Sequence, residues 1–523
     1  MNRREFLGAA AAISLTGRAM FPLATFGHAS SSGRNLVPDR PAAAPNYWCT
    51  WAVQNYLYGQ DNQTIDVAQL EGSSGASLAH NAMNENVLLG AHGWALQFYP
   101  RIRKDLYLLL DDGWESGGTS TFQLDPVKFS SFKGSSVERL RALSRRIEGL
   151  GWRGLALWCR NTPGGEADIN LENLCKDAGV HYWKVDIGDQ NFNLIRRRDE
   201  AGIPLTLEHV QGEPPLNGDW SIDGKFGSQP WDSERMRILR HTDVYRTYDV
   251  TAILSLPTTL DRTSEMLHAA AGHPEIRSLL NVEDEVYVAA VLGCTMGVMR
   301  HPLQRLRPAG DPDLFFNGVR NCKSRMDEVV RALRWQRIAQ PYPVGTGTFQ
   351  RSSETLRDGW KFRPGDTWNG DLVGSTVWQS APSVLARNIE LPIVSSDGEK
   401  PFVFAARFPN GAVAVGSQER TSPKRAWYMP HSSVAINVSD APGPFGIFGT
   451  YKSLTLEFLH APHNKRVLAQ DLAGSEALDI TAMTSQTGNK ITIDGELLRR
   501  IGGLASTPGD LSSPGAVVAF ALP

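Results

Sequence analysis

Carboxylates follow several short apolar runs of the sequence, and their neighbours suit sugar chemistry. The run 106–110 is followed by Asp111 and Asp112, with Trp114 just beyond them. An Asp pair beside a Trp is a common way to hold a sugar, because carboxylates accept hydrogen bonds from hydroxyls and an indole face packs against the CH side of the ring. A turn or a helix N-cap after the run is the structural alternative for this pair.

A second carboxylate, Asp186, ends the apolar run 182–185. Lys184 lies two positions earlier, so in a strand the two side chains point to the same face. A cation beside a carboxylate keeps that carboxylate ionised, as a nucleophile requires. The alternative is a structural ion pair.

A third carboxylate, Asp249, follows the run 244–247 and lies three residues after Arg246. Two carboxyl groups about 5 to 5.5 Å apart are typical of a retaining glycosidase, whereas a gap of about 6.5 to 9.5 Å leaves room for a water and gives inversion. The sequence does not fix that gap.

Composition excludes several classes of function. Lys plus Arg (53) nearly balance Asp plus Glu (55), the net charge is −2, and no basic run occurs, so neither nucleic acid nor an anionic membrane is indicated as a partner. The histidines are scattered without metal-ligand spacing, and no serine lies in a GxSxG elbow. These residues indicate no metal and no organic cofactor.

The five cysteines contain no CxxC pair and are too sparse for a disulfide scaffold, so at most two bridges can form. A bridge between Cys159 and Cys175 and a pair of buried thiols remain alternatives. The cysteines are Cys49, Cys159, Cys175, Cys294 and Cys322.

The elements that must position these residues follow a βα pattern. Short apolar runs alternate with amphipathic stretches such as 136–150 and 323–338, whose apolar residues recur every three or four positions. This pattern predicts an α/β fold, a (β/α)8 TIM barrel over about 40–340, with an open doubly wound sheet as the alternative. In such a barrel the C-terminal ends of the strands carry the chemistry. The eight predicted strands are 47–53, 106–110, 154–158, 182–185, 204–207, 244–247, 277–282 and 297–300.

The last third of the chain has a different periodicity. Residues 341–395 are rich in Pro, Gly and Trp and are predicted to form a linker or long loop. From about 396 the apolar residues alternate, and Asn410-Gly411 between two such runs indicates a hairpin. We therefore expect a C-terminal antiparallel β-sandwich over 396–523.

The N-terminus resembles an export signal. Arg3 and Arg4 precede a mildly apolar stretch that ends in small residues near Ala29. This is the pattern of a twin-arginine signal peptide over 1–30, and the apolar stretch is too short for a spanning helix. We expect a periplasmic or secreted mature chain that is not a membrane protein.

The order of the motifs resembles a known group of enzymes. Asp111-Asp-Gly-Trp, Trp183-Lys-Val-Asp and Tyr245-Arg-Thr-Tyr-Asp are similar to motifs of glycoside hydrolase clan D, the α-galactosidases and α-N-acetylgalactosaminidases of families 27 and 36. Trp48-Cys-Thr-Trp and the stretch from Glu283 to 303 resemble the first strand and the seventh helix to eighth strand of that clan. The resemblance covers about 45–523 and includes its terminal β domain.

The resemblance implies roles for these residues. Asp186 is the expected nucleophile and Asp249 the expected general acid/base, while Asp111 and Asp112 hold the hydroxyls at positions 4 and 6 of the sugar. Lys184 would reach positions 3 and 4. The further implied substrate contacts are Trp48 and Trp114, which line the subsite, and Glu208 and Arg246, which face the 2-substituent.

Two positions depart from the family pattern. Gly113 stands where family 27 members typically carry Cys, and Asp249 follows Arg246 by three residues where the family has four. Asp243, at the predicted strand start, is therefore an alternative acid. The segment 208–220 matches neither the galactose nor the N-acetylgalactosamine pattern closely.

Together these features predict an exported retaining α-glycosidase that hydrolyses terminal α-galactosyl-type sugars of an oligosaccharide, polysaccharide or glycoconjugate. One alternative is a carbohydrate-binding protein on the same scaffold that does not hydrolyse. The other is a barrel enzyme of different specificity, such as an α-N-acetylgalactosaminidase, a β-L-arabinopyranosidase or a transglycosylase.

Overall fold

The computed structural model describes most of the chain from residue 30 onward. The predicted signal peptide and Asp249 lie outside the described residues. These residues are 30–54, 57–58, 73–117, 121–160, 166–186, 192–210, 221–222, 233–247, 255–303, 325–361, 367–368, 371–372, 376–422, 428–461 and 465–521.

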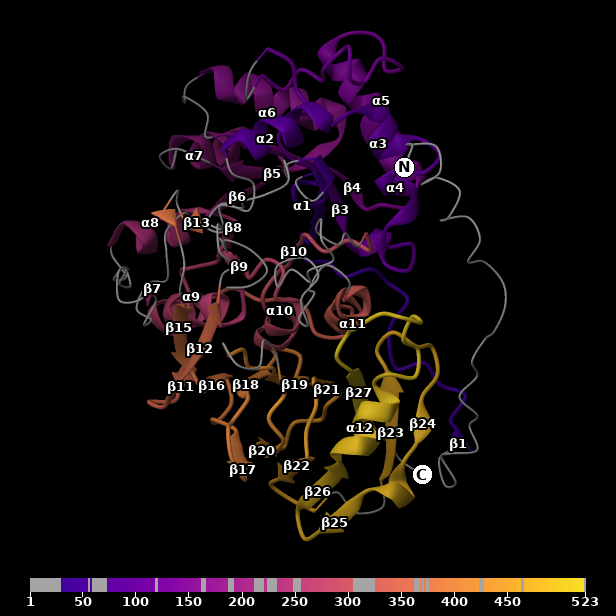
Figure 1. Cartoon of the computed structure of the whole chain (residues 1–523), viewed down its shortest axis with the longest axis vertical. Coiled ribbons are helices and arrows are strands. Elements are labelled where there is room, and N and C mark those ends of the chain that lie inside the picture. Colours follow the sequence, from indigo (N-terminus) through magenta and orange to yellow (C-terminus); the bar gives the residue numbers. More distant parts are fainter. Residues whose placement is uncertain are drawn as a thin grey trace.

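Eight parallel strands form a nearly closed barrel, seen in the upper half of Figure 1. A parallel bridge between Asn281 and Thr295 links the two ends of the sheet. Each of the eight apolar runs overlaps one strand, so the predicted parallel barrel is confirmed over the open sheet. In pairing order the strands are β10 (Gly297–Val298), β2 (Tyr47–Cys49), β3 (Tyr107–Leu110), β4 (Gly154–Arg160), β5 (Val180–Asp186), β6 (Thr206–Val210), β8 (Val244–Arg246) and β9 (Leu279–Asn281).

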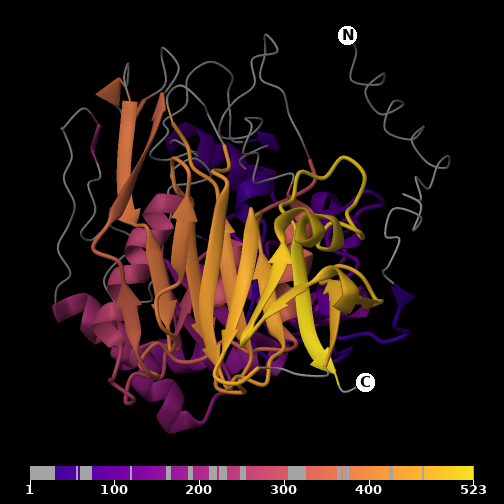
Figure 2. The same cartoon turned by 90° about the horizontal axis from the view of Figure 1, so that it is seen from below.

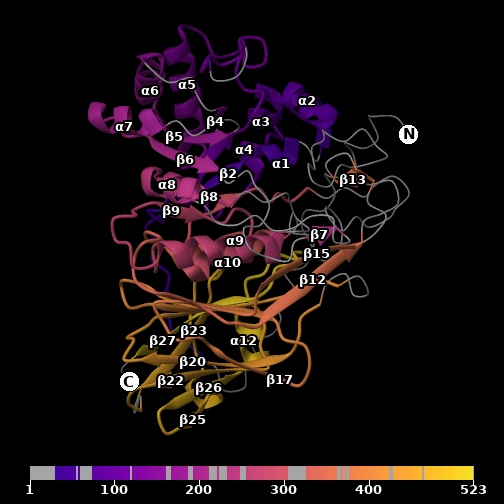
Figure 3. The same ribbon diagram turned by 90° about the vertical axis from the view of Figure 1, so that its left-hand side faces the viewer.

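Helices connect the strands and flank the barrel (Figures 1 and 3). The predicted helix 136–150 is α5, which starts at a capping box between Ser135 and Glu138 and buries Leu140, Leu143 and Ile147 on one face. The helices are α1 (Trp51–Gln54), α2 (Ser73–Ala82), α3 (Glu85–Leu89), α4 (Trp94–Gln97), η3 (Arg103–Asp105), α5 (Ser136–Gly149), α6 (Glu166–Ala178), α7 (Phe192–Ala201), α8 (Ser233–His241), α9 (Ser255–Ala270), α10 (Val286–Leu292) and α11 (Met326–Gln336).

The alternation of side chains along each strand separates two buried layers. Tyr47 and Cys49 belong to the cluster inside the barrel, whereas Trp48 between them belongs to the large core outside the strands. In the same way Trp158 lies inside, and its neighbour Cys159 lies outside. A strand residue therefore reaches the barrel interior only if it has the parity of these inner positions.

Two largely antiparallel sheets follow the barrel, and Figure 2 views them from below. Three strand pairs within them are parallel, namely β16–β18, β19–β21 and β20–β22. The nine-stranded sheet runs β1 (Ser30–Ser31), β24 (Leu478–Asp479), β23 (Arg466–Asp471), β27 (Gly515–Ala521), β21 (Phe445–Phe448), β19 (Val413–Gln418), β18 (Phe402–Arg407), β16 (Val384–Arg387), β11 (Phe349–Arg351). The five-stranded sheet runs β17 (Ile393–Ser396), β20 (Ser432–Ser439), β22 (Ser453–Phe458), β26 (Lys490–Asp494), β25 (Ser485–Thr487). Two helices, η5 (Thr481–Met483) and α12 (Gly495–Ile501), belong to the same region.

The nine-stranded sheet is buried on both faces. Val403 and Ala405 of β18 pack into a core shared with the five-stranded sheet, whereas Phe402 and Phe404 join the core of the barrel. Helices α10 and α11 lie between the barrel strands and this sheet (Figure 1). This position explains why β18 and β19 are buried at nearly every residue, whereas buried and more exposed residues alternate along the outer strand β20.

The predicted hairpin is present, because β18 and β19 are antiparallel and flank Asn410 and Gly411. Of these two residues only Gly411 has a positive φ, at 85°. Among the described residues, no helix combines the length and hydropathy needed to cross a bilayer.

The segment 341–395 contains strands where the sequence predicted a linker or long loop. Strands β12 (Thr355–Lys361) and β15 (Thr376–Pro382) pair along seven residues, and β15 also pairs with β7 (Ser221–Ile222) from the connection after β6. Figure 3 shows this hairpin reaching from the C-terminal sheets toward β7. Two shorter strands, β13 (Thr367–Trp368) and β14 (Asp371–Leu372), pair with each other.

Candidate active site

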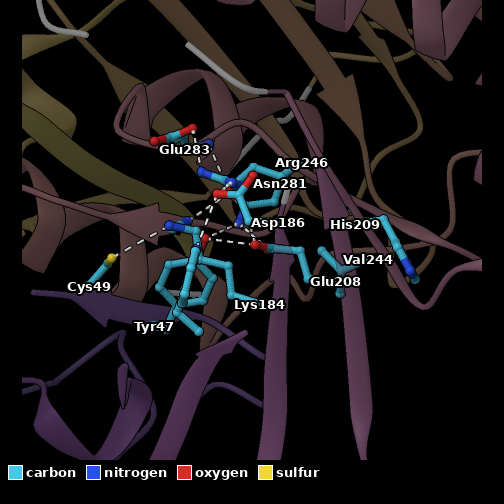
Figure 4. A network of polar contacts seen from close by, with 12 residues as sticks. Tyr47, Cys49, Lys184, Asp186, Glu208, His209, Val244, Arg246, Asn281 and Glu283 are labelled. Carbon is cyan, nitrogen blue, oxygen red and sulfur yellow. Dashed lines mark hydrogen bonds and ion pairs between the residues drawn. The ribbon is translucent and has the colours of Figure 1, made fainter. Parts of the chain in front are cut away.

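Charged residues from β5, β6 and β8 meet inside the barrel near the C-terminal ends of the strands (Figure 4), and Asp111, directly after β3, joins them through Lys184. They point inward because they share the parity of Tyr47 and Trp158 on their strands. The sequence-predicted residues among them are Asp111, Lys184, Asp186, Glu208 and Arg246.

Lys184 and Asp111 form a buried ion pair across the barrel. The Lys184 Nζ lies 2.7 Å from Oδ2 of Asp111, and both side chains are at most 3% exposed. Burial alone lowers the pKa of Lys184, but the negative charge of Asp111 and its neighbours outweighs burial and raises that pKa. The Cys49 thiol donates to the same oxygen at 3.0 Å, and burial raises the pKa of this thiol. The Lys184 cation therefore faces Asp111 rather than acting on Asp186 alone.

Asp186 is held at the carboxyl end of β5 by two donors. The Nη2 of Arg246 lies 3.2 Å from its Oδ2, and the indole Nε1 of Trp158 donates to the same oxygen at 3.3 Å. The Asp186 side chain remains 18% exposed. Both donors favour the charged form of the carboxyl group, so Asp186 is an oriented carboxylate that solvent and ligands can reach.

Arg246 is fully buried and joins three carboxylates. Besides Asp186, its Nε lies 3.4 Å from Glu208 and its Nη1 lies 3.4 Å from Glu283. Burial by itself lowers the pKa of Arg246. The surrounding negative charges, of which Glu283 has the largest effect, outweigh burial and raise this pKa well above its ordinary value. The guanidinium is therefore a fixed positive charge at the centre of the site.

Glu208 lies deep in the barrel interior and is surrounded by donors. Tyr47 donates to Oε1 at 2.9 Å, while Tyr182 and Asn281 donate to Oε2 at 2.7 and 2.6 Å. Burial and the charge of Glu208 raise the pKa of both tyrosines well above the ordinary value, so both remain donors. With Arg246 as a fourth neighbour, the Glu208 carboxylate is enclosed by side chains of the barrel.

Glu283 completes this network just after β9. It is a non-glycine residue with a positive φ of 52°, a conformation that costs free energy and often occurs at functional sites. Its backbone N–H donates to the Asn281 side chain at 2.8 Å, and burial raises the pKa of its carboxyl group.

Asp112 lies beside Asp111 but faces a different neighbour. Its Oδ1 is 2.9 Å from Nδ1 of His80, which α2 places over the end of β3. Its backbone N–H donates to Oδ1 of Asp111 at 3.0 Å. The predicted Asp pair is therefore split, with one carboxylate bound by Lys184 and the other by His80.

The two predicted tryptophans lie outside the barrel interior. Trp48 packs between Phe98 and Trp152, and its Nε1 donates to the Arg300 carbonyl at 3.1 Å. Trp114 is fully buried in the same outer core, and its Nε1 donates to a backbone carbonyl. The indole that reaches Asp186 is that of Trp158.

The alternative acid Asp243 lies at the opposite end of β8 from Arg246. It forms an ion pair with Arg198 and accepts a hydrogen bond from the backbone of Leu207 at 2.8 Å. Asp249 is outside the described residues. Of the two carboxylates expected from the sequence, the structure therefore places only Asp186.

Sequence reasoning missed six residues of this site. Strand parity was the available signal for the inner-face residues, because Tyr47 and Cys49 flank Trp48 and must point the other way. Glu283 began a stretch that resembles the family but received no site role, and His80 had no local signal. The missed residues are Tyr47, Cys49, His80, Trp158, Asn281 and Glu283.

The arrangement is suited to binding and attacking a polyhydroxylated molecule. Buried carboxylates accept hydrogen bonds from hydroxyls, and Lys184 and Arg246 supply donors and positive charge. Among the described residues, no group of His, Cys, Asp and Glu is arranged to hold a metal ion. Cys49, Cys159, Cys175 and Cys294 are buried and form no disulfide within the described part of the chain, and Cys322 lies outside the described residues.

Comparison with family models and with curated proteins gives no match for this chain.

Proposed function

We propose that this protein is an exported retaining α-glycosidase that acts on terminal α-galactosyl-type sugars. The observation that carries the proposal is the placement of Asp186, whose Oδ2 is held by Arg246 and Trp158 beside the buried pair of Asp111 and Lys184. In this proposal the fold is a (β/α)8 barrel with a C-terminal β-sandwich, as in glycoside hydrolase clan D.

The proposed reaction has two displacements. The Asp186 carboxylate attacks the anomeric carbon while Asp249 donates a proton to the leaving glycosidic oxygen, which gives a covalent glycosyl ester. Asp249 then removes a proton from water, which attacks the anomeric carbon and releases Asp186. Arg246 and Trp158 keep Asp186 ionised and oriented throughout.

The residues proposed to contact the substrate differ in how deeply they are buried. Asp111 and Lys184 are almost completely buried and take hydroxyls of the sugar ring, whereas Asp112 is more exposed and takes a hydroxyl nearer the rim. No cofactor or metal takes part in this mechanism, and the partner is the carbohydrate itself.

Export by the twin-arginine route is part of the proposal. A mature chain that begins near residue 30 retains Ser30 and Ser31, which pair with β24 at the edge of the nine-stranded sheet. N-terminal sequencing of the protein recovered from the periplasm or medium tests this. A mature N-terminus near residue 30 supports export, and a chain that keeps Arg3 and Arg4 in the cytoplasm contradicts it.

The deciding experiment measures nitrophenol release by the mature chain from the α-galactoside, the α-N-acetylgalactosaminide and the β-L-arabinopyranoside. We expect hydrolysis of at least one, lost in Asp186→Asn while the circular dichroism spectrum is unchanged. A 2-deoxy-2-fluoro glycoside should label Asp186 covalently, as a mass increase on the peptide that contains it. A folded protein that is neither active nor labelled would contradict the proposal.

The acid assignment has its own test. Asp249→Ala should lose activity on poor leaving groups and recover turnover with added azide, giving a glycosyl azide of retained configuration. Asp243→Asn is the matched control, because the ion pair of Asp243 with Arg198 lies at the other end of β8. Azide rescue of Asp243→Asn instead of Asp249→Ala would move the acid to Asp243.

A further inference from the structure

A chain of charged side chains connects the nine-stranded sheet with the turn that follows β9. Negative and positive charges alternate along this ion chain, and each member lies within ion-pair distance of the next. Four of the five side chains are at most 2% exposed, and the fifth, Asp284, is 15% exposed. In order from the sheet the members are Glu419, Arg325, Glu328, Arg300 and Asp284.

The far end of the ion chain belongs to the C-terminal sheets. Glu419 directly follows β19, and its Oε1 lies 2.6 Å from Nη2 of Arg325, the N-cap residue of α11. The Ser513 hydroxyl bridges these two residues, because it accepts from Arg325 at 2.6 Å and donates to Glu419 at 2.9 Å. Glu328 of α11 then pairs with both Arg325 and Arg300. Three ion pairs thus connect the sheet with Arg300, which lies two residues after β10.

The near end of the ion chain fixes the turn that carries Glu283. Arg300 donates from Nη2 to the Asp284 carbonyl at 2.6 Å. Oδ1 of Asp284 accepts from the backbone N–H groups of Met299 and Arg300 at 2.9 and 3.2 Å. Glu283, the preceding residue, has the positive φ of 52°. A non-glycine residue keeps such a conformation only where its surroundings determine it, and the contacts of Asp284 with Arg300 do so here.

The position of Glu283 is linked to that of Asp186 through Arg246. The two carboxyl groups lie at the two Nη atoms of this arginine, at 3.4 and 3.2 Å (Figure 4). Because a guanidinium is planar and rigid, the positions of its two partners depend on each other. A displacement of Glu283 therefore changes the direction from which Arg246 holds Asp186.

Buried ion pairs contribute little net stability, because the cost of desolvation offsets most of the attraction between the charges. Removing one partner, however, leaves the other as an uncompensated buried charge, so each member of the ion chain holds its neighbours in place. A continuous set of such pairs between the sheet and the turn therefore fixes geometry more than it adds stability.

We propose that the C-terminal sheets position the proposed nucleophile Asp186 through this ion chain, and that Glu419 at its far end is a positioning residue of the site. The inference rests on the proposed function in one respect, the role of Asp186 as nucleophile. The coupling is carried by contiguous charged contacts from Glu419 to Asp284 and then by the backbone to Glu283.

The test measures hydrogen exchange in the full mature chain. The amides of Met299 and Arg300 donate to Asp284, so their exchange reports whether the turn is held. In Glu419→Gln the charge at the far end is lost, Arg325 draws Glu328 away from Arg300, and these two amides should exchange about tenfold faster, the protection of roughly one hydrogen bond. Glu419→Asp keeps the charge and should restore most of the protection. Unchanged exchange in folded Glu419→Gln would overturn the inference.

The matched control is Asp471→Asn. Asp471 of the same sheet binds Arg331 of α11 at 3.0 and 3.1 Å, and both side chains are at most 2% exposed, but this pair is not a member of the ion chain. Asp471→Asn should therefore lower the free energy of unfolding and leave the amides of Met299 and Arg300 as in wild type. Equal acceleration in Asp471→Asn and Glu419→Gln would show a general loss of stability and contradict the positioning role.

A milder pair of variants decides the question if Glu419→Gln does not fold. Ser513→Ala removes the hydroxyl that bridges Arg325 and Glu419, whereas Ser506→Ala removes a hydroxyl that accepts from Arg331 at 2.8 Å. Exchange at the two reporter amides should become faster in Ser513→Ala and stay unchanged in Ser506→Ala. The same exchange rate in both serine variants would speak against the inference.

Turnover provides the second readout. Glu419→Gln should lower kcat by about tenfold with little change in KM, because the orientation of the nucleophile rather than sugar binding is disturbed, and Asp471→Asn should keep both constants. An active Glu419→Gln with unchanged kcat would contradict the positioning of Asp186. The two proposals fail separately, because hydrogen exchange needs no substrate. A chain that hydrolyses nothing but shows the Glu419-dependent exchange contradicts only the glycosidase, and an active glycosidase whose exchange is independent of Glu419 contradicts only the inference.

Discussion

The indole Nε1 of Trp158 donates to Oδ2 of Asp186 from the neighbouring strand at 3.3 Å. The two residues sit on β4 and β5, which pair in parallel, and both point into the barrel. This bond stabilises the charged form of the proposed nucleophile and also limits its rotation. No sequence motif had indicated Trp158, yet its indole binds the oxygen of the proposed nucleophile.

Trp158→Phe should therefore lower kcat by about ten- to a hundredfold, the range expected for a hydrogen bond to a charged group. Because the bond orients and stabilises the attacking carboxylate, the loss should appear in kcat more than in KM. Trp152→Phe is the matched control, since Trp152 lies in the core outside the barrel interior and its Nε1 donates to a backbone carbonyl at 2.9 Å. An unchanged kcat in Trp158→Phe would contradict this role.

Glu208 gives a prediction that distinguishes an anchor from a substrate contact. Glu208→Gln puts an amide donor among Tyr47, Tyr182 and Asn281, which already donate, and removes a counter-charge from Arg246. We expect a loss of about 3 to 5 kcal/mol in the free energy of unfolding. Activity should fall by the same factor on a galactoside and on its 2-deoxy analogue, measured as kcat/KM. A larger loss on the galactoside would indicate direct contact with the 2-hydroxyl.

The sequence predicts those parts of the site whose position follows from neighbouring residues along the chain. The eight strands follow from apolar runs, and Asp111, Lys184 and Asp186 could be placed because each lies on or directly after such a run. The Trp48 prediction came from a motif, whereas parity along β2 sends that side chain outward. Local pattern thus fixes the face of a residue but not its neighbours.

The other contacts of the site depend on the packing of segments that are far apart in the sequence. Glu208 meets Tyr47 and Asn281 only because the barrel brings β2, β6 and β9 around one interior. The strands of 341–395 were predicted as a linker because the partner of β15 is a two-residue strand, β7, about 150 residues earlier in the chain. Neither relationship leaves a periodic signal in the sequence.

The buried pair of Lys184 and Asp111 should be strongly coupled. Lys184→Met leaves Asp111 buried without its counter-charge and should cost about 3 to 5 kcal/mol of the free energy of unfolding, while the double variant with Asp111→Asn should recover part of this loss. The exposed pair Arg196 and Glu200 is the control, expected to contribute at most about 0.5 kcal/mol. Denaturant unfolding of the four variants of each cycle measures both couplings. Additive effects at Lys184 and Asp111 would contradict the coupling.

His209 predicts how stability depends on pH. Its side chain is buried on the outer face of β6, with Nδ1 2.9 Å from the Thr242 hydroxyl, and burial lowers its pKa to about 4. The unfolded chain, with an ordinary histidine pKa of about 6.5, binds this proton first as the pH falls. Stability from this group is therefore complete above about pH 6.5 and is lost between there and about pH 4, by about 3 kcal/mol. His209→Gln should flatten the fall in the unfolding free energy over that interval, whereas the exposed His273→Gln should leave it unchanged. An equally steep fall in His209→Gln would assign the acid sensitivity to other groups.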